Sequence, residues 1–273
     1  MIRSVHQLAH EALLTADPAD KCHRVAELRR GWLAGDCVAV PGRDDPHPVT
    51  EPGRPARPQL VPPQNVPLRR VTSPEGHAAL LHAIAHIEFN AINLALDCVM
   101  RFRSFPSDFH GDWLQVAAEE ALHFKLVRER LQALGFDYGD FPAHDGLWQM
   151  CCRTASDSLA RMALIPRVLE ARGLDATPPI MEKLRRIGDL ASVDVLEIIL
   201  RDEVGHVALG DRWFRKLCAD QALDVEATYL HLIEAFDAPR PQPPFHEEAR
   251  LAAGFTQSEL DALKRAASAA RRA

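Results

Sequence analysis

Hydrophobic positions recur at helical spacing through most of this 273-residue chain. From residue 75 to about 103, apolar side chains return every three or four positions, which is the period of a helix with one buried face. The same period predicts three further long helices, at about 110–134, 145–172 and 190–218. Shorter helices are expected at about 5–15, 18–33, 177–188, 222–237 and 256–271. No segment alternates as a strand does, so the pattern predicts an all-α protein.

Capping residues indicate where several of these helices begin and end. Asp17 and Ser73 are each followed by a proline, which is the arrangement of an N-cap before the first helical turn. Gly35, Gly135 and Gly173 each follow a periodic apolar stretch, where glycine can end a helix with left-handed backbone. Helices are therefore expected to start after the two caps and to stop at the three glycines.

Proline separates the first two helices from the rest of the chain. Ten of the 20 prolines fall between Pro41 and Pro74. Because proline removes a backbone donor and restricts the residue before it, this stretch is expected to form an extended arm, either lying along the domain or partly disordered. Apolar residues between Leu60 and Leu68 favour an arm that docks. The predicted organisation, within one compact domain, is a helical pair (1–34), the arm (35–73), a four-helix bundle (74–220) and a C-terminal helical extension (221–273).

Each of the four long helices carries a carboxylate in the middle of its apolar stripe. These are Glu88, Glu120, Glu170 and Glu203. Because an unpaired buried carboxylate is costly, each needs a hydrogen-bonding or cationic partner. His123 and His206 follow the second and fourth glutamates by three positions, a spacing that places both side chains on one helix face. The pattern indicates a core cluster of carboxylates and imidazoles.

The glutamates repeat along the chain at nearly constant spacing. Glu88 precedes Glu120 by 32 residues. Glu170 precedes Glu203 by 33. Each half therefore has the form of a helix with Glu, a connection, and a helix with Glu-x-x-His. Two such antiparallel hairpins predict a four-helix bundle, and their combined donor set is the one described for ferritin-like di-iron and di-manganese proteins.

The donor types restrict the metal. Carboxylate oxygen and imidazole nitrogen suit iron or manganese, whereas thiolate would suit zinc or an iron–sulfur cluster. The six cysteines form no C-x-x-C pair and are expected to be reduced thiols. We therefore expect two iron ions, although donor type alone does not separate iron from manganese or from a mixed pair. Which glutamates bridge the ions is left open, and the alternative is a set of buried ion pairs without metal.

Residues beside the candidate ligands carry further expectations. Glu119 and Asp202 could accept hydrogen bonds from the histidine ligands, with a solvated helix flank or a salt bridge as the alternative. Pro166 lies one turn before the third glutamate and should kink its helix, which would open space beside the metals. Arg161 and Arg167 are expected at the surface, with contact to an anionic substrate as the alternative.

Seven segments carry a resemblance to a known family. They are GRPARPQLV (53–61), LLHAIAHIEFNAINLALDCVMRF (80–102), DWLQVAAEEALHF (112–124), YGDFPAHDGLW (138–148), RMALIPRVLEARGLD (161–175), RDEVGHVALGDRWF (201–214) and EARLAAGF (248–255). Over nearly its whole length the chain resembles a ferritin-like family catalogued as domain of unknown function 455. The resemblance implies a ferritin-like bundle with a two-metal site. The chain is more distantly similar to bacterial tRNA hydroxylases, which share the ligand pattern.

The expected activity is that of a non-haem di-iron oxygenase or oxidase, which uses dioxygen to hydroxylate or oxidise an organic substrate. Its partners would be dioxygen, a small-molecule substrate and an electron donor, the last two unidentified. A tyrosyl-radical generator is rejected, because the turn after His123 holds Leu126 and Val127 instead of tyrosine. The alternatives are a tRNA-modifying hydroxylase and a non-enzymatic protein that handles metal or consumes peroxide.

Composition and charge limit the class of protein and its location in the cell. The net charge is −6 and the apolar share is 47%, which is ordinary for a soluble globular protein. The acidic balance argues against a nucleic-acid partner held by bulk positive charge. No run approaches 18 uncharged apolar residues, and charged residues occur within the first few positions, so neither a membrane span nor a secretory signal is expected. We therefore expect a cytoplasmic monomer or homodimer.

Overall fold

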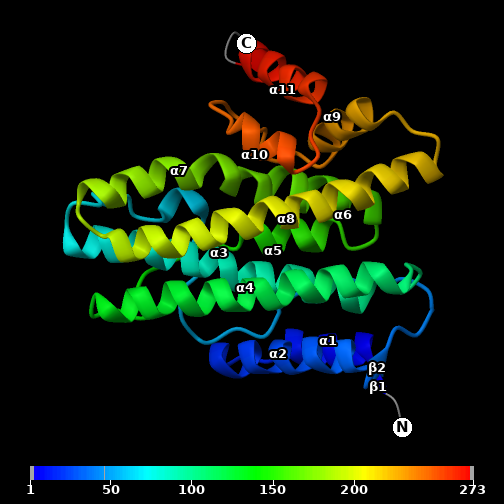
Figure 1. Cartoon of the computed structure of the whole chain (residues 1–273), viewed down its shortest axis with the longest axis horizontal. Helices are drawn as coiled ribbons and strands as arrows, with labels where there is room; N and C mark the ends of the chain where they lie inside the picture. The colour runs from blue at the N-terminus through cyan, green and yellow to red at the C-terminus, as the bar shows by residue number, and fades with distance from the viewer. Residues whose placement is uncertain (1–2, 46, 271–273) are drawn as a thin grey trace. The chain divides into compact units, whose positions relative to one another are not determined.

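The computed structural model describes residues 3–45 and 47–270, and these are mostly helical, which confirms the all-α class (Figure 1). The α-helices are α1 (Val5–Leu13), α2 (Pro18–Ala34), α3 (Pro74–Arg101), α4 (Ser107–Ala133), α5 (Gly146–Arg153), α6 (Ser158–Leu164), α7 (Ala171–Arg186), α8 (Leu190–Asp220), α9 (Val225–Ala235), α10 (Glu247–Ala252) and α11 (Gln257–Ala270). There is also a 3-10 turn, η1 (Pro63–Asn65), and a π-helix, η2 (Ile165–Glu170).

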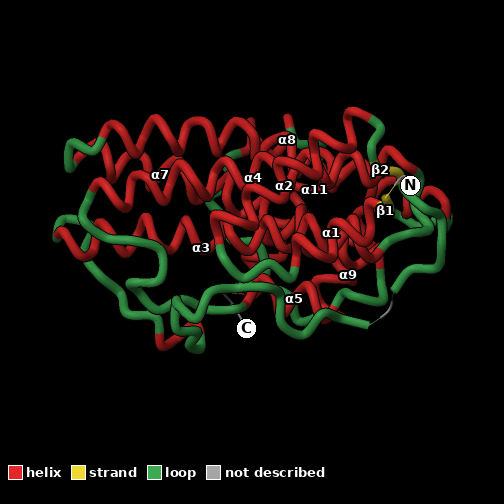
Figure 2. The backbone as a smooth tube through the Cα atoms, turned by 90° about the horizontal axis from the view of Figure 1, so that it is seen from below, coloured by secondary structure: helices red, strands yellow, loops and turns green. Residues whose placement is uncertain are grey.

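The expectation that no strand forms is wrong at one place. Two strands of two residues each, β1 (Arg3–Ser4) and β2 (Cys37–Val38), pair in parallel. Figure 2 shows them in yellow beside the N-terminus. They are too short to produce the alternating pattern by which a strand is recognised in a sequence.

The helices group into two compact units that the chain enters alternately. The first unit contains the chain up to Ser156 together with Ile187–Val195. The second contains Asp157–Arg186 together with the chain from Leu196 onward. The helix α8 therefore begins in the first unit and continues in the second.

The first unit is built on the hairpin of α3 and α4, which lie side by side in Figure 1. Helix α1 packs on α3, and α2 packs on α4. Helix α3 is long and apolar enough to cross a membrane, but 78% of its most apolar window is buried inside the protein. It is thus the core helix of this unit, as in a soluble protein.

The predicted caps of α2 and α3 are confirmed. The Asp17 carboxylate accepts hydrogen bonds from the backbone N–H groups of Ala19 and Asp20. The Ser73 hydroxyl accepts one from the N–H of Gly76. At the other end, Gly35 has φ of 78°, so α2 stops in the left-handed conformation that glycine permits.

Of the two forms expected for the proline-rich arm, the structure shows the docked one, and one joint with the helices lies at Gly53. The buried ammonium group of Lys21 donates to the backbone carbonyls of Leu13 and Gly53, both at 2.8 Å, and to the Asn93 side chain of α3. A Cβ atom at Gly53 would overlap the backbone of Leu14, so only glycine allows this approach. The joint ties the arm, α1, α2 and α3 together.

Further along, backbone and side-chain bonds attach the arm to the region around α5. The Trp148 indole donates to the carbonyl of Val49 at 3.0 Å. Arg54 forms an ion pair with Asp145 at 2.9 Å. Pro52 and Pro58 of the arm are buried as well, whereas Leu68 is fully exposed.

The predicted continuous helix at 145–172 is wrong, and so is its predicted end at Gly173. The chain leaves the helix after Arg153, and Asp157 then caps α6 by accepting from the N–H of Ala160. Helix α7 continues through Gly173 and two prolines to Arg186. The side chains of Leu174, Met181 and Leu184 are buried across this stretch. Their packing outweighs the local stop signals.

Candidate metal centre

The α3–α4 hairpin brings three of the candidate ligands to one level. Glu88 lies 13 residues before the last residue of α3, and Glu120 lies 13 residues after the first residue of α4. In an antiparallel hairpin, residues at equal distances from the turn lie opposite one another. His123 follows Glu120 on the same face of α4. The hairpin geometry therefore explains why these side chains meet.

The three side chains form a compact buried cluster. Nδ1 of His123 lies 3.4 Å from Oε2 of Glu88 and 3.5 Å from Oε2 of Glu120. Each residue offers a potential metal-ligating atom, and these atoms lie within 4.8 Å of one another. Glu120 and His123 are completely buried, and Glu88 is 4% exposed. Donors so close together, in so little contact with solvent, could hold a metal ion.

The carboxylates of the cluster change the charge state of its histidine. Burial of the His123 imidazole lowers its pKa, but the adjacent carboxylates of Glu120 and Glu88 outweigh burial and raise the pKa to about 11. The histidine is therefore an imidazolium that balances part of the carboxylate charge. A divalent cation could replace this proton, since metal ligation requires the neutral imidazole. Two carboxylates and an imidazole fit iron or manganese.

The remaining candidate ligands lie in the second unit. Glu203 and His206 are buried one turn apart on α8, with Nδ1 of the histidine 3.7 Å from Oε1 of the glutamate. Glu170 is also buried and is the last residue of η2. The distortion expected at Pro166 therefore takes the form of a π-helix. The opening of space beside a metal stays a prediction.

The two acidic residues that precede the histidine motifs have neighbours on their own helices. Glu119 accepts a hydrogen bond from the Gln115 side chain at 3.1 Å. Asp202 forms an ion pair with Arg201 at 2.8 Å. Their role as acceptors behind the histidine ligands stays a prediction.

The expectation that Arg161 and Arg167 lie at the surface is wrong, because both are completely buried. Arg167 forms ion pairs with Asp211 at 3.1 Å and with Glu259 at 2.5 Å. Both partners come from distant parts of the chain, which is why the sequence around the arginine carries no sign of them. Only the apolar residues that flank Arg167, Pro166 and Val168, hint at burial.

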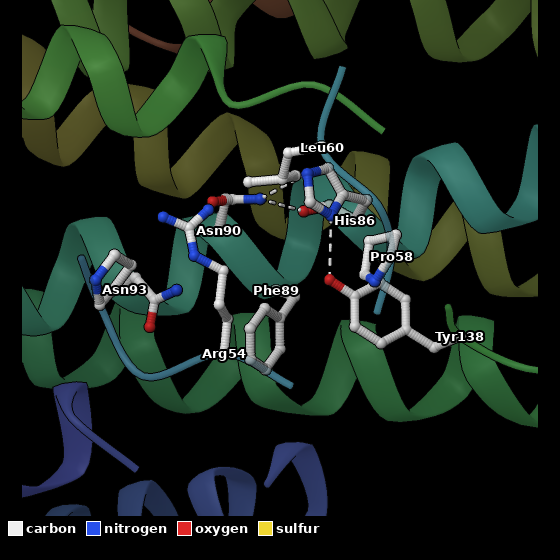
Figure 3. A pocket seen from close by; sticks show the side chains of 9 residues that line it. Arg54, Pro58, Leu60, His86, Phe89, Asn90, Asn93 and Tyr138 are labelled. Carbon is white, nitrogen blue, oxygen red and sulfur yellow. Dashed lines mark hydrogen bonds between the residues drawn. The ribbon is translucent and has the colours of Figure 1, made fainter. Parts of the chain in front are cut away.

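A small pocket lies between the arm and another face of α3 (Figure 3). His86, Phe89, Asn90 and Asn93 line it from α3, at the spacing of one helix face. Nδ1 of His86 lies 2.9 Å from the Tyr138 hydroxyl, and its Nε2 lies 3.0 Å from the carbonyl of His144. Glu88, two positions from His86, points to a different face. The pocket is thus separate from the carboxylate cluster.

Fold and site together define an all-α protein with a buried carboxylate–histidine cluster. The chain belongs to the family described as "Protein of unknown function (DUF455)", whose model matches residues 14–261. All six candidate ligands lie within that match. The chain is 45% identical over 271 residues to an "Uncharacterized protein" of Haemophilus influenzae, covering 96% of this chain and 94% of that protein. No solved structure matches it.

Proposed function

We propose that this protein is a ferritin-like, non-haem di-iron oxidoreductase that uses dioxygen to hydroxylate or oxidise an organic substrate. Its ligands would be Glu88, Glu120, His123, Glu170, Glu203 and His206. The two half-sites would join into one centre at the middle of a four-helix bundle formed by α3, α4, α8 and the helix that contains η2. We place the protein in the cytoplasm, where its cysteines would stay reduced.

The buried cluster of Glu88, Glu120 and His123 is the observation that carries this proposal. It supports the proposal because two carboxylates and an imidazole place potential metal-ligating atoms within 4.8 Å of one another in a buried site, and these donor types suit iron or manganese. The second half of the chain repeats the same sequence pattern with a separation of 33 residues instead of 32. A site built twice in this way supplies enough donors for two ions.

The chain's own residues would bind and orient the ions and keep water away from them. When bound, an iron pair supplies the Lewis acidity and the electrons that dioxygen activation needs. Val116, Ala117 and Val127 are buried on the same side of α4 as the ligands and exclude water there. No protein nucleophile is required. Electrons must come from a separate donor.

Metal content after anaerobic purification from iron-supplemented cells tests the proposal. We expect two irons per chain by elemental analysis and a new absorption band when oxygen is added. Glu120→Gln should lose metal and the absorption change, because it removes a ligand charge at unchanged volume. Glu129→Gln is the matched control, since the same change on the same helix affects an exposed residue. Wild-type protein that is folded but binds no transition metal would overturn the proposal.

Activity measurements on the same preparation distinguish an oxygenase or oxidase from a protein that only handles metal. An oxygenase or oxidase should turn over only with an electron donor and an organic substrate. Iron oxidation that proceeds at the same rate with neither would instead identify a metal-handling or peroxide-consuming protein.

A further inference from the structure

Glu170, the last residue of η2, lies on an unusual backbone segment, a π-helix. The π-helix Ile165–Glu170 has i→i+5 bonding, so each of its hydrogen bonds spans one more residue than in an α-helix. Each residue of an α-helix turns the chain by about 100°. If η2 relaxed to an α-helix, Glu170 would therefore rotate by about that angle relative to α6. The direction of this carboxylate depends on whatever holds η2 in its wide form.

The side chain of Arg167 lies at the centre of the contacts that hold η2. Its Nη2 donates to Oε1 of Glu259 on α11 at 2.5 Å, and its Nε lies 3.1 Å from Oδ1 of Asp211 on α8. Three aromatic rings surround the guanidinium, with centroids 4.3–4.7 Å away: Phe214, Tyr229 and Phe255. One side chain of η2 is thus bound by α8, by α9 and by the C-terminal segment.

The backbone of η2 is also held in place, at Arg167 and at Pro166. The Tyr229 hydroxyl donates to the carbonyl of Arg167 at 2.7 Å. At Gly210 of α8, a Cβ atom would overlap the ring of Pro166, so glycine lets that helix approach η2 closely. These contacts fix consecutive residues, Pro166 and Arg167, just before the glutamate.

The charges around the arginine balance without using any candidate ligand. Arg215 also donates to Asp211 at 2.7 Å and to Glu259 at 2.6 Å. Two arginines and two carboxylates therefore form a closed network. A largely buried network of this kind adds little stability compared with apolar packing, and we infer that its role here is to fix the geometry of η2.

We propose that Arg167 is a positioning residue that holds η2 as a π-helix and so directs Glu170 toward one of the two metals. This inference rests on the proposed function. In this proposal the helices α9 and α11 hold the segment that carries Glu170. The C-terminal part of the chain is therefore needed to bind the metal that Glu170 ligates.

Metal stoichiometry in full-length variants tests this role. Apo-protein is loaded with Mn²⁺, passed through a desalting column, and measured by elemental analysis and electron paramagnetic resonance. Wild type should bind two ions with the spectrum of a coupled pair. Arg167→Met and Glu259→Gln should each retain one ion, with the hyperfine pattern of an isolated ion and unchanged helical circular dichroism. Arg186→Met, an exposed arginine of α7, is the matched control and should bind two.

Each failure has its own signature. Wild type without bound Mn²⁺ overturns the proposed function. Wild type and Arg167→Met both with a coupled pair overturn the positioning role alone. Equal loss of both ions in Arg167→Met also overturns it, because a general structural defect would affect the half-sites alike. If Arg167→Met does not fold, Glu259→Gln decides, and a coupled pair in that variant overturns the inference.

Discussion

Two buried histidines of the first unit show how strongly surroundings set the charge of one side chain. His123 lies between two carboxylates, which raise its pKa to about 11 despite burial. His82 is equally buried, but burial and the neighbouring His86 lower its pKa to about 4. His82 accepts a hydrogen bond from the N–H of Gly139 at 2.9 Å, which requires a neutral ring nitrogen. Without a bound metal the first histidine is a cation, whereas the second is a neutral acceptor.

The lowered pKa of His82 predicts an acid-dependent loss of stability. Between pH 6.5 and about 4 the unfolded chain binds a proton at this residue and the folded chain does not. Stability from His82 is therefore complete above pH 6.5 and is lost as the pH falls, by up to about 1.4 kcal/mol per pH unit. His82→Gln keeps an acceptor but cannot titrate. Urea unfolding at several pH values should give the variant a shallower acid slope than wild type.

The control for this experiment is the range above pH 7, where the His82 proton is absent from both states. Wild type and His82→Gln should there show the same dependence on pH. Parallel curves between pH 4 and 6.5 would contradict the assignment.

Single residues also show how far the sequence alone could lead. The approach of Glu88 to Glu120 and His123 could be predicted, because helical period and hairpin spacing together bring them to one level. Metal binding there stays a prediction. The buried position of Arg167 could not be predicted, since its partners Asp211 and Glu259 are brought near only by tertiary folding.

At the scale of helices and strands, the sequence predicts a helix end correctly where the hydrogen bond that fixes it joins residues close together in the chain. The caps at Asp17 and Ser73 bind backbone groups within three residues, so the sequence shows them directly. The π-helix and the run of α7 through Gly173 depend instead on side chains from other helices. A proline or glycine in isolation therefore indicates that a helix is perturbed, but its outcome depends on packing.

The close approach of α8 to η2 predicts a large effect of one methyl group. Gly210→Ala should destabilise the protein by about 1–3 kcal/mol, because the new Cβ atom would overlap the ring of Pro166. Gly173→Ala is the matched control within a helix, and its Cβ would meet no described atom within 4 Å. The control should stabilise the protein by about 0.5–1 kcal/mol. Chemical denaturation measures both, and equal effects would contradict the close contact.

At the scale of the whole molecule, metal binding should be linked to folding. A ligand that binds only the folded state adds about 2.7 kcal/mol when its free concentration is 100 times Kd. Chelator-treated protein should therefore unfold at a lower temperature than protein with added Mn²⁺. Glu120→Gln should lose most of this difference, and Glu129→Gln should keep it. A metal-induced shift of the same size in Glu120→Gln would mean that the ion binds elsewhere.

The alternating path of the chain through its two units has a consequence for synthesis and cleavage. Asp189, which belongs to the short returning segment Ile187–Val195, binds His77 at 2.7 Å and Arg130 at 3.0 Å. The first unit therefore lacks these contacts until the ribosome has also released Asp157–Arg186 of the second. A protease that cuts around Ser156 would leave Ile187–Val195 on the fragment that carries the second unit, so the rest of the first unit would keep this segment only through non-covalent contacts such as those of Asp189.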